Sequence, residues 1–126
     1  MYTMMEACRM TDMNYEALKF YCNQGLVPNV KRDKNNRRVF DEHDIAWIRD
    51  LVCLKKCGMS IQEMKDYLAL CLQGAATIPQ RQAMLARKQQ ALRVQIAELE
   101  DSAAYIDWKQ TFYSDVLAGR RPYVSN

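Results

Sequence analysis

Helix-breaking residues are scarce in this chain of 126 residues, which contains 4 glycines and 3 prolines. No segment shows a sustained alternation of apolar and polar residues, so the composition favours helices over an extensive sheet. The length suits one modest domain rather than a catalytic domain joined to a separate regulatory one. We therefore expect a mainly α protein in which one function dominates.

The chain also lacks any C-x-x-C pair among its 5 cysteines, and no apolar run approaches the length of a membrane span. Its N-terminus does not have the basic-then-apolar layout of a signal peptide. An odd number of cysteines without an export signal does not describe a disulfide framework, so reduced thiols are expected. These absences predict a cytoplasmic protein with no membrane partner.

Catalytic and metal-binding sets are missing as well. The single histidine, His43, lies between Glu42 and Asp44, and the sequence places no further metal ligands nearby. There is no nucleotide-binding glycine loop, and no Ser-His-Asp or Cys-His set can be assembled. We predict that His43 is an exposed surface residue, and that the protein is not an enzyme and uses neither a metal nor another cofactor.

Two short helices are expected at the start of the chain. The apolar residues of segment 4–10 give the first helix a partly apolar face, and Asp12, which tolerates a left-handed turn, interrupts the pattern. Asn14 is a good N-cap for a second helix, which Gly25 would end. Two helices joined by such a tight turn fit helix-turn-helix geometry.

Residues 31–40, here called the wing, carry much of the positive charge of the chain. Pro28 prevents the second helix from continuing, and the centre of the wing is rich in turn residues, so a small hairpin is expected. Taken alone, such a run of charge is more often a solvated loop. Five basic residues lie within eight positions and are opposed only by Asp33: Lys31, Arg32, Lys34, Arg37 and Arg38.

Capping signatures predict the helices that follow. Asp41 would cap a third helix that ends at Gly58, and Ser60 with Glu63 forms a capping box at the start of a fourth. Segment 74–78 is expected to be a linker. Thr77-Ile78-Pro79-Gln80 repeats the capping signature, with proline in the first turn, and so predicts the start of a last helix.

The last helix has an apolar seam of about four heptads and no Gly or Pro between Gln80 and Gly119. Its stripe is too narrow to pack on the N-terminal part along its whole length, so pairing with a second copy is the simplest interpretation. An intramolecular hairpin and a coil with a different protein are the alternatives. The seam consists of Leu92, Ile96, Leu99, Ala103, Ile106, Gln110, Tyr113 and Leu117.

A helix-turn-helix, a basic hairpin and a dimerising helix, in that order, indicate a DNA-binding dimer. An architectural or excisionase-like winged-helix protein is the alternative, against which the long seam argues. In the dimer, the second helix would enter the major groove with Asn14, Tyr15, Glu16 and Lys19 exposed. The backbone contacts would come from Tyr21, Lys31, Arg32, Arg37 and Arg38.

Residues 2–28, YTMMEACRMTDMNYEALKFYCNQGLVP, and residues 31–45, KRDKNNRRVFDEHDI, resemble the N-terminal region of MerR-family transcription regulators. The similarity extends in order over about residues 2–72, and the long helix follows where that family has its dimerisation helix. Four positions depart from the family pattern. Lys19 replaces an arginine, Phe20 a tyrosine, Asp12 a turn glycine and Cys22 a glutamate. Lysine lacks the bidentate fork of arginine, so Lys19 is expected to contact a phosphate.

The resemblance implies a winged helix-turn-helix domain in residues 1–74, a dimerisation helix in 75–118 and a short tail in 119–126. It further implies a homodimer held by an antiparallel coiled coil on a pseudo-palindromic site in a promoter spacer. Such regulators bend and untwist this double-stranded promoter DNA so that the RNA polymerase holoenzyme can engage both promoter elements.

Members of this family usually carry their sensor after the dimerisation helix, where eight residues remain here, and metal-sensing relatives use cysteines at the end of that helix, whereas no cysteine follows Cys71. The resemblance therefore implies a signal other than a drug or a metal. The segment Ile48 to Gly58 resembles that of a short subgroup of the family that responds to aldehydes and nitrosative stress through a cysteine, here Cys53. Arg49 and Lys56 lie about one turn away and would favour a thiolate. Cys57 is a candidate resolving thiol. The alternative is that Cys53 fills the core, as we expect for Cys71.

Overall fold

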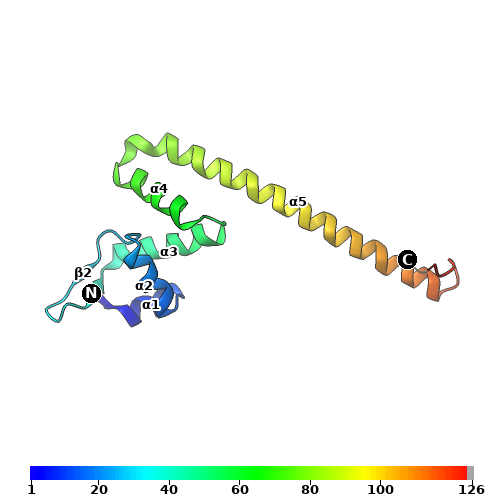
Figure 1. The fold of residues 1–126 in the computed structure, drawn as a ribbon, viewed down its shortest axis with the longest axis horizontal. Coiled ribbons are helices and arrows are strands. Elements are labelled where there is room, and N and C mark those ends of the chain that lie inside the picture. The colour runs from blue at the N-terminus through cyan, green and yellow to red at the C-terminus, as the bar shows by residue number, and fades with distance from the viewer. Residues whose placement is uncertain (125–126) are drawn as a thin grey trace. The chain divides into compact units, whose positions relative to one another are not determined.

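The computed structural model describes residues 1–124 and contains helices with one small sheet (Figure 1). The chain divides into two units, the first spanning Met1–Lys88 and the second beginning at Gln89. The elements are β1 (Tyr2–Thr3), α1 (Met4–Thr11), α2 (Tyr15–Asn23), β2 (Lys31–Arg32), β3 (Arg38–Phe40), α3 (Glu42–Lys56), α4 (Ile61–Leu72), the 3-10 helix η1 (Ala75–Thr77) and α5 (Ile78–Leu117).

The predicted N-caps of three helices are confirmed. The side chain of Asn14 accepts a hydrogen bond from the backbone of Ala17 (2.7 Å) at the start of α2. Asp41 at α3 and Ser60 at α4 each form a complete capping box. These side chains satisfy backbone donors that have no partner inside the helix, which is why each helix begins where it does.

The turn between α1 and α2 confirms the expectation for Asp12. This residue adopts φ 56° and ψ 37°, and the backbone N–H of Met13 donates to the carbonyl of Cys8 (3.1 Å). The left-handed conformation reverses the chain within three residues, so that α2 returns across α1. At the far end of α2, Gly25 has φ 76°, a conformation that glycine adopts without strain.

One apolar core holds the first unit together. Leu18 of α2, Phe40 of β3 and Ile48 of α3 are fully buried in it, and Met64 contributes from α4. Met84, in the early part of α5, packs against the same core. This core fixes the positions of α2 and the wing, the two elements that carry the candidate DNA contacts.

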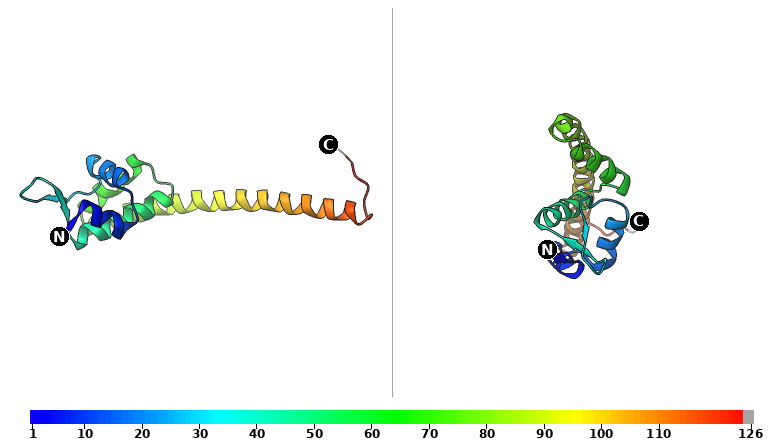
Figure 2. Two further views of the ribbon diagram at one scale, coloured as in Figure 1. Left: turned by 90° about the horizontal axis from the view of Figure 1, so that it is seen from below. Right: turned by 90° about the vertical axis from the view of Figure 1, so that its left-hand side faces the viewer.

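The wing forms the predicted antiparallel hairpin, in which Lys31 pairs with Val39 and Arg32 with Arg38. Its loop projects from the helices of the first unit (Figure 2). The sheet has a third strand, β1, which pairs with β3 through Tyr2 and Phe40. The sequence did not predict this strand because it contains two residues. The hydroxyl of Tyr2 also donates to the carboxylate of Glu42, which anchors β1 to α3.

The linker between α4 and α5 differs from the expectation. Thr77 does not cap α5. Its side chain is buried and its hydroxyl donates to the carbonyl of Leu70 in α4, while it accepts a hydrogen bond from Nε of Arg81 (3.1 Å). Residues 75–77 form a 3-10 turn after Gly74, which has φ 83°. The prediction failed because the hydroxyl bonds to the carbonyl of Leu70 in α4 and to the side chain of Arg81, and not to a backbone N–H group at the start of α5.

The last helix, α5, contains 40 residues without interruption, as the absence of glycine and proline predicted. Although it is long, it is rich in polar residues. Within residues 1–124, no helix combines the length and the apolar character required to cross a membrane.

Candidate nucleic-acid interface

The N-terminal half of α2 presents the side chains that the sequence assigned to the major groove. Asn14, Tyr15, Glu16 and Lys19 are all exposed. Tyr15 retains 44% of its surface although it is a large aromatic residue. Leu18, on the opposite face, anchors the helix in the core. This arrangement leaves one polar face of a rigid helix available for base edges.

The tip of the wing is organised by the carboxylate of Asp33. Its Oδ1 accepts hydrogen bonds from the backbone N–H groups of Asn35 (2.9 Å) and Arg37 (3.0 Å). Asn36 adopts φ 61°, a left-handed conformation that asparagine tolerates. The one acidic residue of the wing therefore acts in shaping the turn, and the basic side chains extend from a defined loop.

The four basic side chains that we expected to contact the DNA backbone differ in their hydrogen bonds and ion pairs within the protein. Nζ of Lys31 forms an ion pair with Asp41 (3.1 Å), and the guanidinium of Arg32 donates to the carbonyl of Asn36 (2.9 Å). Arg38 donates from Nη2 to Oδ1 of Asn23 at the end of α2 (2.6 Å). That bond joins the wing to α2, so the two elements form one continuous surface. The exposed Arg37 makes no side-chain hydrogen bond within the described residues.

Asp41 links this basic surface to α3. The backbone N–H of Asp44 and the ammonium of Lys31 both donate to the Asp41 carboxylate, and they lower its pKa from 3.8 to about 2. Asp44 itself is buried, and burial raises the pKa of its carboxyl. Asp41 therefore remains charged at neutral pH and holds Lys31 at the base of the wing.

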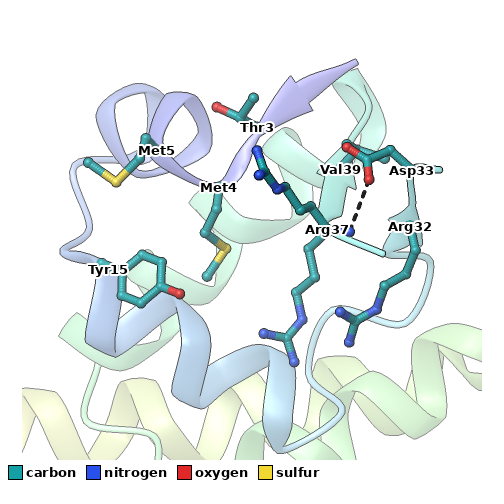
Figure 3. Close-up of a pocket in the computed structure, with 9 residues that line it drawn as sticks. Thr3, Met4, Met5, Tyr15, Arg32, Asp33, Arg37 and Val39 are labelled. Carbon is teal, nitrogen blue, oxygen red and sulfur yellow. Dashed lines mark hydrogen bonds between the residues drawn. The ribbon is translucent and has the colours of Figure 1, made fainter. Parts of the chain in front are cut away.

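A pocket of about 470 Å³ lies where the wing meets the helix-turn-helix. Figure 3 shows Met4 and Tyr15 on one side of it and Arg32, Asp33 and Arg37 on the other. Thr3 and Met5 also contribute to the wall, although no sequence pattern assigned them to a site. Their placement follows from β1 and the Thr3–Glu6 capping box, which start α1 beside the wing. A pocket with several guanidinium groups is suited to an anion such as a phosphate.

Tyr21 does not fit the predicted role. Its side chain is 2% exposed and lies in the core, and its hydroxyl is buried without a hydrogen-bond partner in the described structure. A side chain in this position cannot reach a DNA phosphate. Tyr21 follows Leu18 by three residues and therefore shares its buried face of α2. The assignment of Tyr21 as a DNA contact is wrong for this conformation.

The cysteines decide two of the expectations. Cys53 is exposed, which contradicts the alternative that it fills the core, and Cys71 is half-buried, whereas we expected it to be part of the core. Arg49, which the sequence placed beside Cys53, instead donates to the carbonyl of Met10 (3.3 and 3.1 Å). Cys57 caps the end of α3 with its backbone N–H. Burial raises the pKa of the two remaining thiols, Cys8 and Cys22.

His43 is exposed, as predicted. Among residues 1–124, no group of three or more His, Cys, Asp or Glu side chains is arranged to hold a metal ion. The chemistry of the first unit is thus that of a polar helix face beside a basic hairpin.

A helix-turn-helix joined to a basic wing defines a winged-helix protein of the DNA-binding class. Comparison with known proteins identifies the family. Residues 2–71 match the family described as MerR HTH family regulatory protein, and residues 45–108 match the family described as MerR, DNA binding. The chain belongs to the MerR family and is a DNA-binding transcriptional regulator of that type.

Individual relatives support the assignment. An HTH-type transcriptional regulator of Haemophilus influenzae is 32% identical over 117 residues, which cover 93% of this chain and 87% of the relative. The regulator AdhR of Bacillus subtilis is 37% identical over 75 residues, or 60% of this chain and 54% of AdhR.

Solved structures agree with these relatives. HiNmlR, a MerR-family regulator that lacks the sensor domain and was crystallised bound to promoter DNA, is 32% identical with a TM-score of 0.77, and the match covers 93% of each chain. A MerR-family regulator described as putative, from Listeria monocytogenes, is 25% identical with a TM-score of 0.84, and the match covers 94% of this chain and 90% of that one.

Proposed function

We propose that the protein acts as a homodimer on a pseudo-palindromic site in a promoter spacer. The observation that carries this proposal is the exposed apolar seam of α5, where Leu99 retains 70% and Leu117 retains 90% of its surface. Exposure of such a seam to water is unfavourable along a 40-residue helix, and burial against another chain would remove this cost. The proposed contacts are Leu92, Ile96, Leu99, Ala103, Ile106, Tyr113 and Leu117.

A two-fold dimer would present two copies of α2 to two half-sites of one operator. Asn14, Tyr15 and Glu16 would face base edges, and Lys19 would face a phosphate. Arg32, Arg37 and Arg38 would contact the DNA backbone beside the pocket at the wing. Lys31 would contact it from the base of the wing. The likeness to HiNmlR, which was solved with promoter DNA, supports promoter DNA as the ligand.

Transcriptional control would follow from deformation of this DNA. In this proposal, the bound dimer bends and untwists an overlong spacer, and the RNA polymerase holoenzyme then engages both promoter elements. Part of the specificity would come from sequence-dependent deformability, because the cost of bending depends on base steps that the protein does not touch.

The signal is proposed to be a reaction at Cys53. Its exposure on α3 gives a small electrophile access to the sulfur. AdhR, which matches part of this chain, is a second named regulator to which the protein is similar. Cys57 lies one turn later, at the C-cap of α3, and is half-buried, which suits a resolving thiol less well than an exposed position would.

The test is transcription in vitro from the DNA upstream of the gene, with wild type and Cys53→Ser, each with and without an aldehyde or a nitrosating agent. We expect activation with wild type and loss of the response in the variant. A response that is identical in both proteins would overturn the role of Cys53. Binding to arrays at recombination ends, with no discrete promoter site, would overturn the regulator proposal in favour of an architectural protein.

A further inference from the structure

Two exposed apolar side chains, Met5 and Tyr15, lie together beside the wing and are here called the apolar ridge. Met5 belongs to the first turn of α1 and keeps 56% of its surface, and Tyr15 belongs to the first turn of α2 and keeps 44%. Both residues line the pocket at the wing, and both also line a second hollow along α1. The apolar ridge therefore separates two depressions of the surface, and Figure 3 shows it on the side of the pocket away from Arg32 and Asp33.

The apolar ridge stands on the starts of two helices that are fixed by hydrogen bonds. At α1, the backbone N–H of Thr3 donates to Oε1 of Glu6 (2.9 Å), and the backbone N–H of Glu6 donates to Oγ1 of Thr3 (3.2 Å). At α2, the side chain of Asn14 accepts a hydrogen bond from the backbone of the first turn (2.7 Å). These capped turns hold the backbone of both ridge residues in a defined position.

Positive charge flanks the apolar ridge on both sides. The pocket at the wing is lined by Arg37 and Arg38, and the second hollow is lined by the exposed Arg9. The major groove of DNA has the complementary pattern, because its floor of base edges lies between two negatively charged phosphate backbones. The groove is about 12 Å wide and admits a helix. The arrangement thus fits a groove in which Arg9 meets one backbone and the wing arginines meet the other.

The chemistry of the groove floor limits what an apolar ridge can contact there. Base edges in the major groove present hydrogen-bond donors and acceptors, and they present one apolar group, the 5-methyl group of thymine. The deoxyribose rings are also apolar, but they belong to the backbones, which the arginines would occupy. The flexible, polarisable thioether of Met5 suits a close contact with a methyl group.

We infer that the apolar ridge makes the protein select thymine in each half-site, with Met5 covering the 5-methyl group and the ring of Tyr15 beside it. Arg9 binds the phosphate backbone on the side of the groove away from the wing. This inference rests on the proposed function, because it requires α2 in the major groove. It adds Met5 as a residue that determines specificity and Arg9 as a further phosphate contact.

The experiment uses the full-length protein and its operator, located by footprinting in the DNA upstream of the gene. Each thymine is replaced in turn by deoxyuridine, which forms the same base pair but lacks the 5-methyl group, and affinity is measured by fluorescence anisotropy. At one thymine position we expect the affinity of wild type to fall about fourfold for each half-site changed, the effect of roughly one buried methyl group.

Variants then connect this preference to the apolar ridge. Met5→Ala should bind the thymine and deoxyuridine operators with equal affinity, whereas Met5→Leu, which remains apolar, should keep a preference for thymine. Leu72→Ala removes another exposed apolar side chain, on α4, and is the control that should keep the full wild-type preference. Arg9→Gln should weaken binding to both operators alike and reduce the dependence of affinity on salt.

The inference would be overturned if no thymine replacement weakened binding of wild type, or if Met5→Ala kept the wild-type preference. An unchanged salt dependence in Arg9→Gln would overturn the placement of the apolar ridge between two backbones. Each of these results leaves recognition of the operator intact, so the proposed function would survive them. Absence of any discrete site in the promoter DNA would instead refute the proposed function, and the inference with it.

Discussion

The side chains of the wing arginines differ in their hydrogen bonds within the protein, and this difference affects the role that each can have in DNA binding. Arg38 reaches the end of α2 through Asn23, whereas Arg37 is exposed at the pocket. Either guanidinium can meet a phosphate, but Arg38 also links the wing to α2. A loss of Arg38 should therefore affect binding on every sequence.

We expect Arg38→Ala to weaken binding to specific and unrelated DNA alike. Removal of one phosphate contact reduces the slope of log K against log salt by about 0.9, because fewer counterions are released. Fluorescence anisotropy between roughly 50 and 200 mM salt measures this slope. Arg87→Ala on α5 is the control and should keep the wild-type slope. If Arg38→Ala kept it as well, the wing would not lie on the DNA backbone.

The carboxyl of Asp41 gives a second prediction at this scale. Its pKa is lowered from 3.8 to about 2 in the folded protein by the N–H of Asp44 and by Lys31. A lowered pKa stabilises the fold above the unfolded value, and this contribution is lost as the pH falls through the folded value. The stability advantage of wild type over Asp41→Asn should be complete at pH 5–7 and should shrink between about pH 4 and 2.

Denaturant unfolding of both proteins at several pH values measures the difference. Asparagine can still cap α3, so the comparison isolates the charge. A difference that stayed constant down to pH 2 would contradict the role of the ionised carboxylate.

Single residues were predictable from the sequence where local chemistry decides their role. Asn14 and Ser60 cap helices through neighbours three residues away, so their roles were evident from spacing. Tyr21 and Arg49 were not, because their positions depend on contacts between helices. Nothing in the local pattern distinguishes a tyrosine that faces DNA from one that faces the core.

At the scale of elements, the turn between α1 and α2 contains a residue in a strained backbone conformation, and this strain can be tested. Asp12 adopts φ 56°, where β-carbon sterics disfavour most residues. We expect Asp12→Ala to be less stable than Asp12→Gly by about 1 kcal/mol, because glycine alone avoids this clash. Thermal unfolding of the two variants gives the order. A more stable alanine variant would mean that the turn does not keep this conformation.

The helices were predictable because their signals are redundant, with caps, apolar spacing and terminal glycines all in agreement. Short elements lacked that redundancy. The strand β1 has two residues and exists because Tyr2 and Thr3 pair with β3. The 3-10 turn at Ala75–Thr77 likewise depends on α4, which accepts the hydroxyl of Thr77.

The seam of α5 allows a direct test of dimerisation. We expect Leu99→Glu to yield monomers at micromolar concentration, because the proposed interface would then bury an unpaired carboxylate. Light scattering after size exclusion measures the mass. Gln90→Glu is the control, since heptad spacing places residue 90 on the opposite side of the helix from the seam. A Leu99→Glu protein that remained dimeric would refute the seam as the interface.

At the scale of the whole molecule, one chain is not sufficient for the proposed function. Promoter recognition requires two chains, since one α2 contacts only one half-site. A dimer can control transcription in this way only if the pairing of the two chains couples both half-sites to one DNA geometry.

That coupling can be measured by changing the DNA. Insertion of about 5 base pairs between the half-sites rotates one of them by roughly half a helical turn, so a dimer of fixed geometry can engage only one. We expect affinity to fall at least about tenfold, to the value for a site with one half scrambled, because the second contact no longer benefits from tethering. Footprinting should then show protection of one half-site. Undiminished affinity with both halves protected would mean that the subunits bind independently, and deformation of the spacer by a rigid dimer would be ruled out as the mechanism.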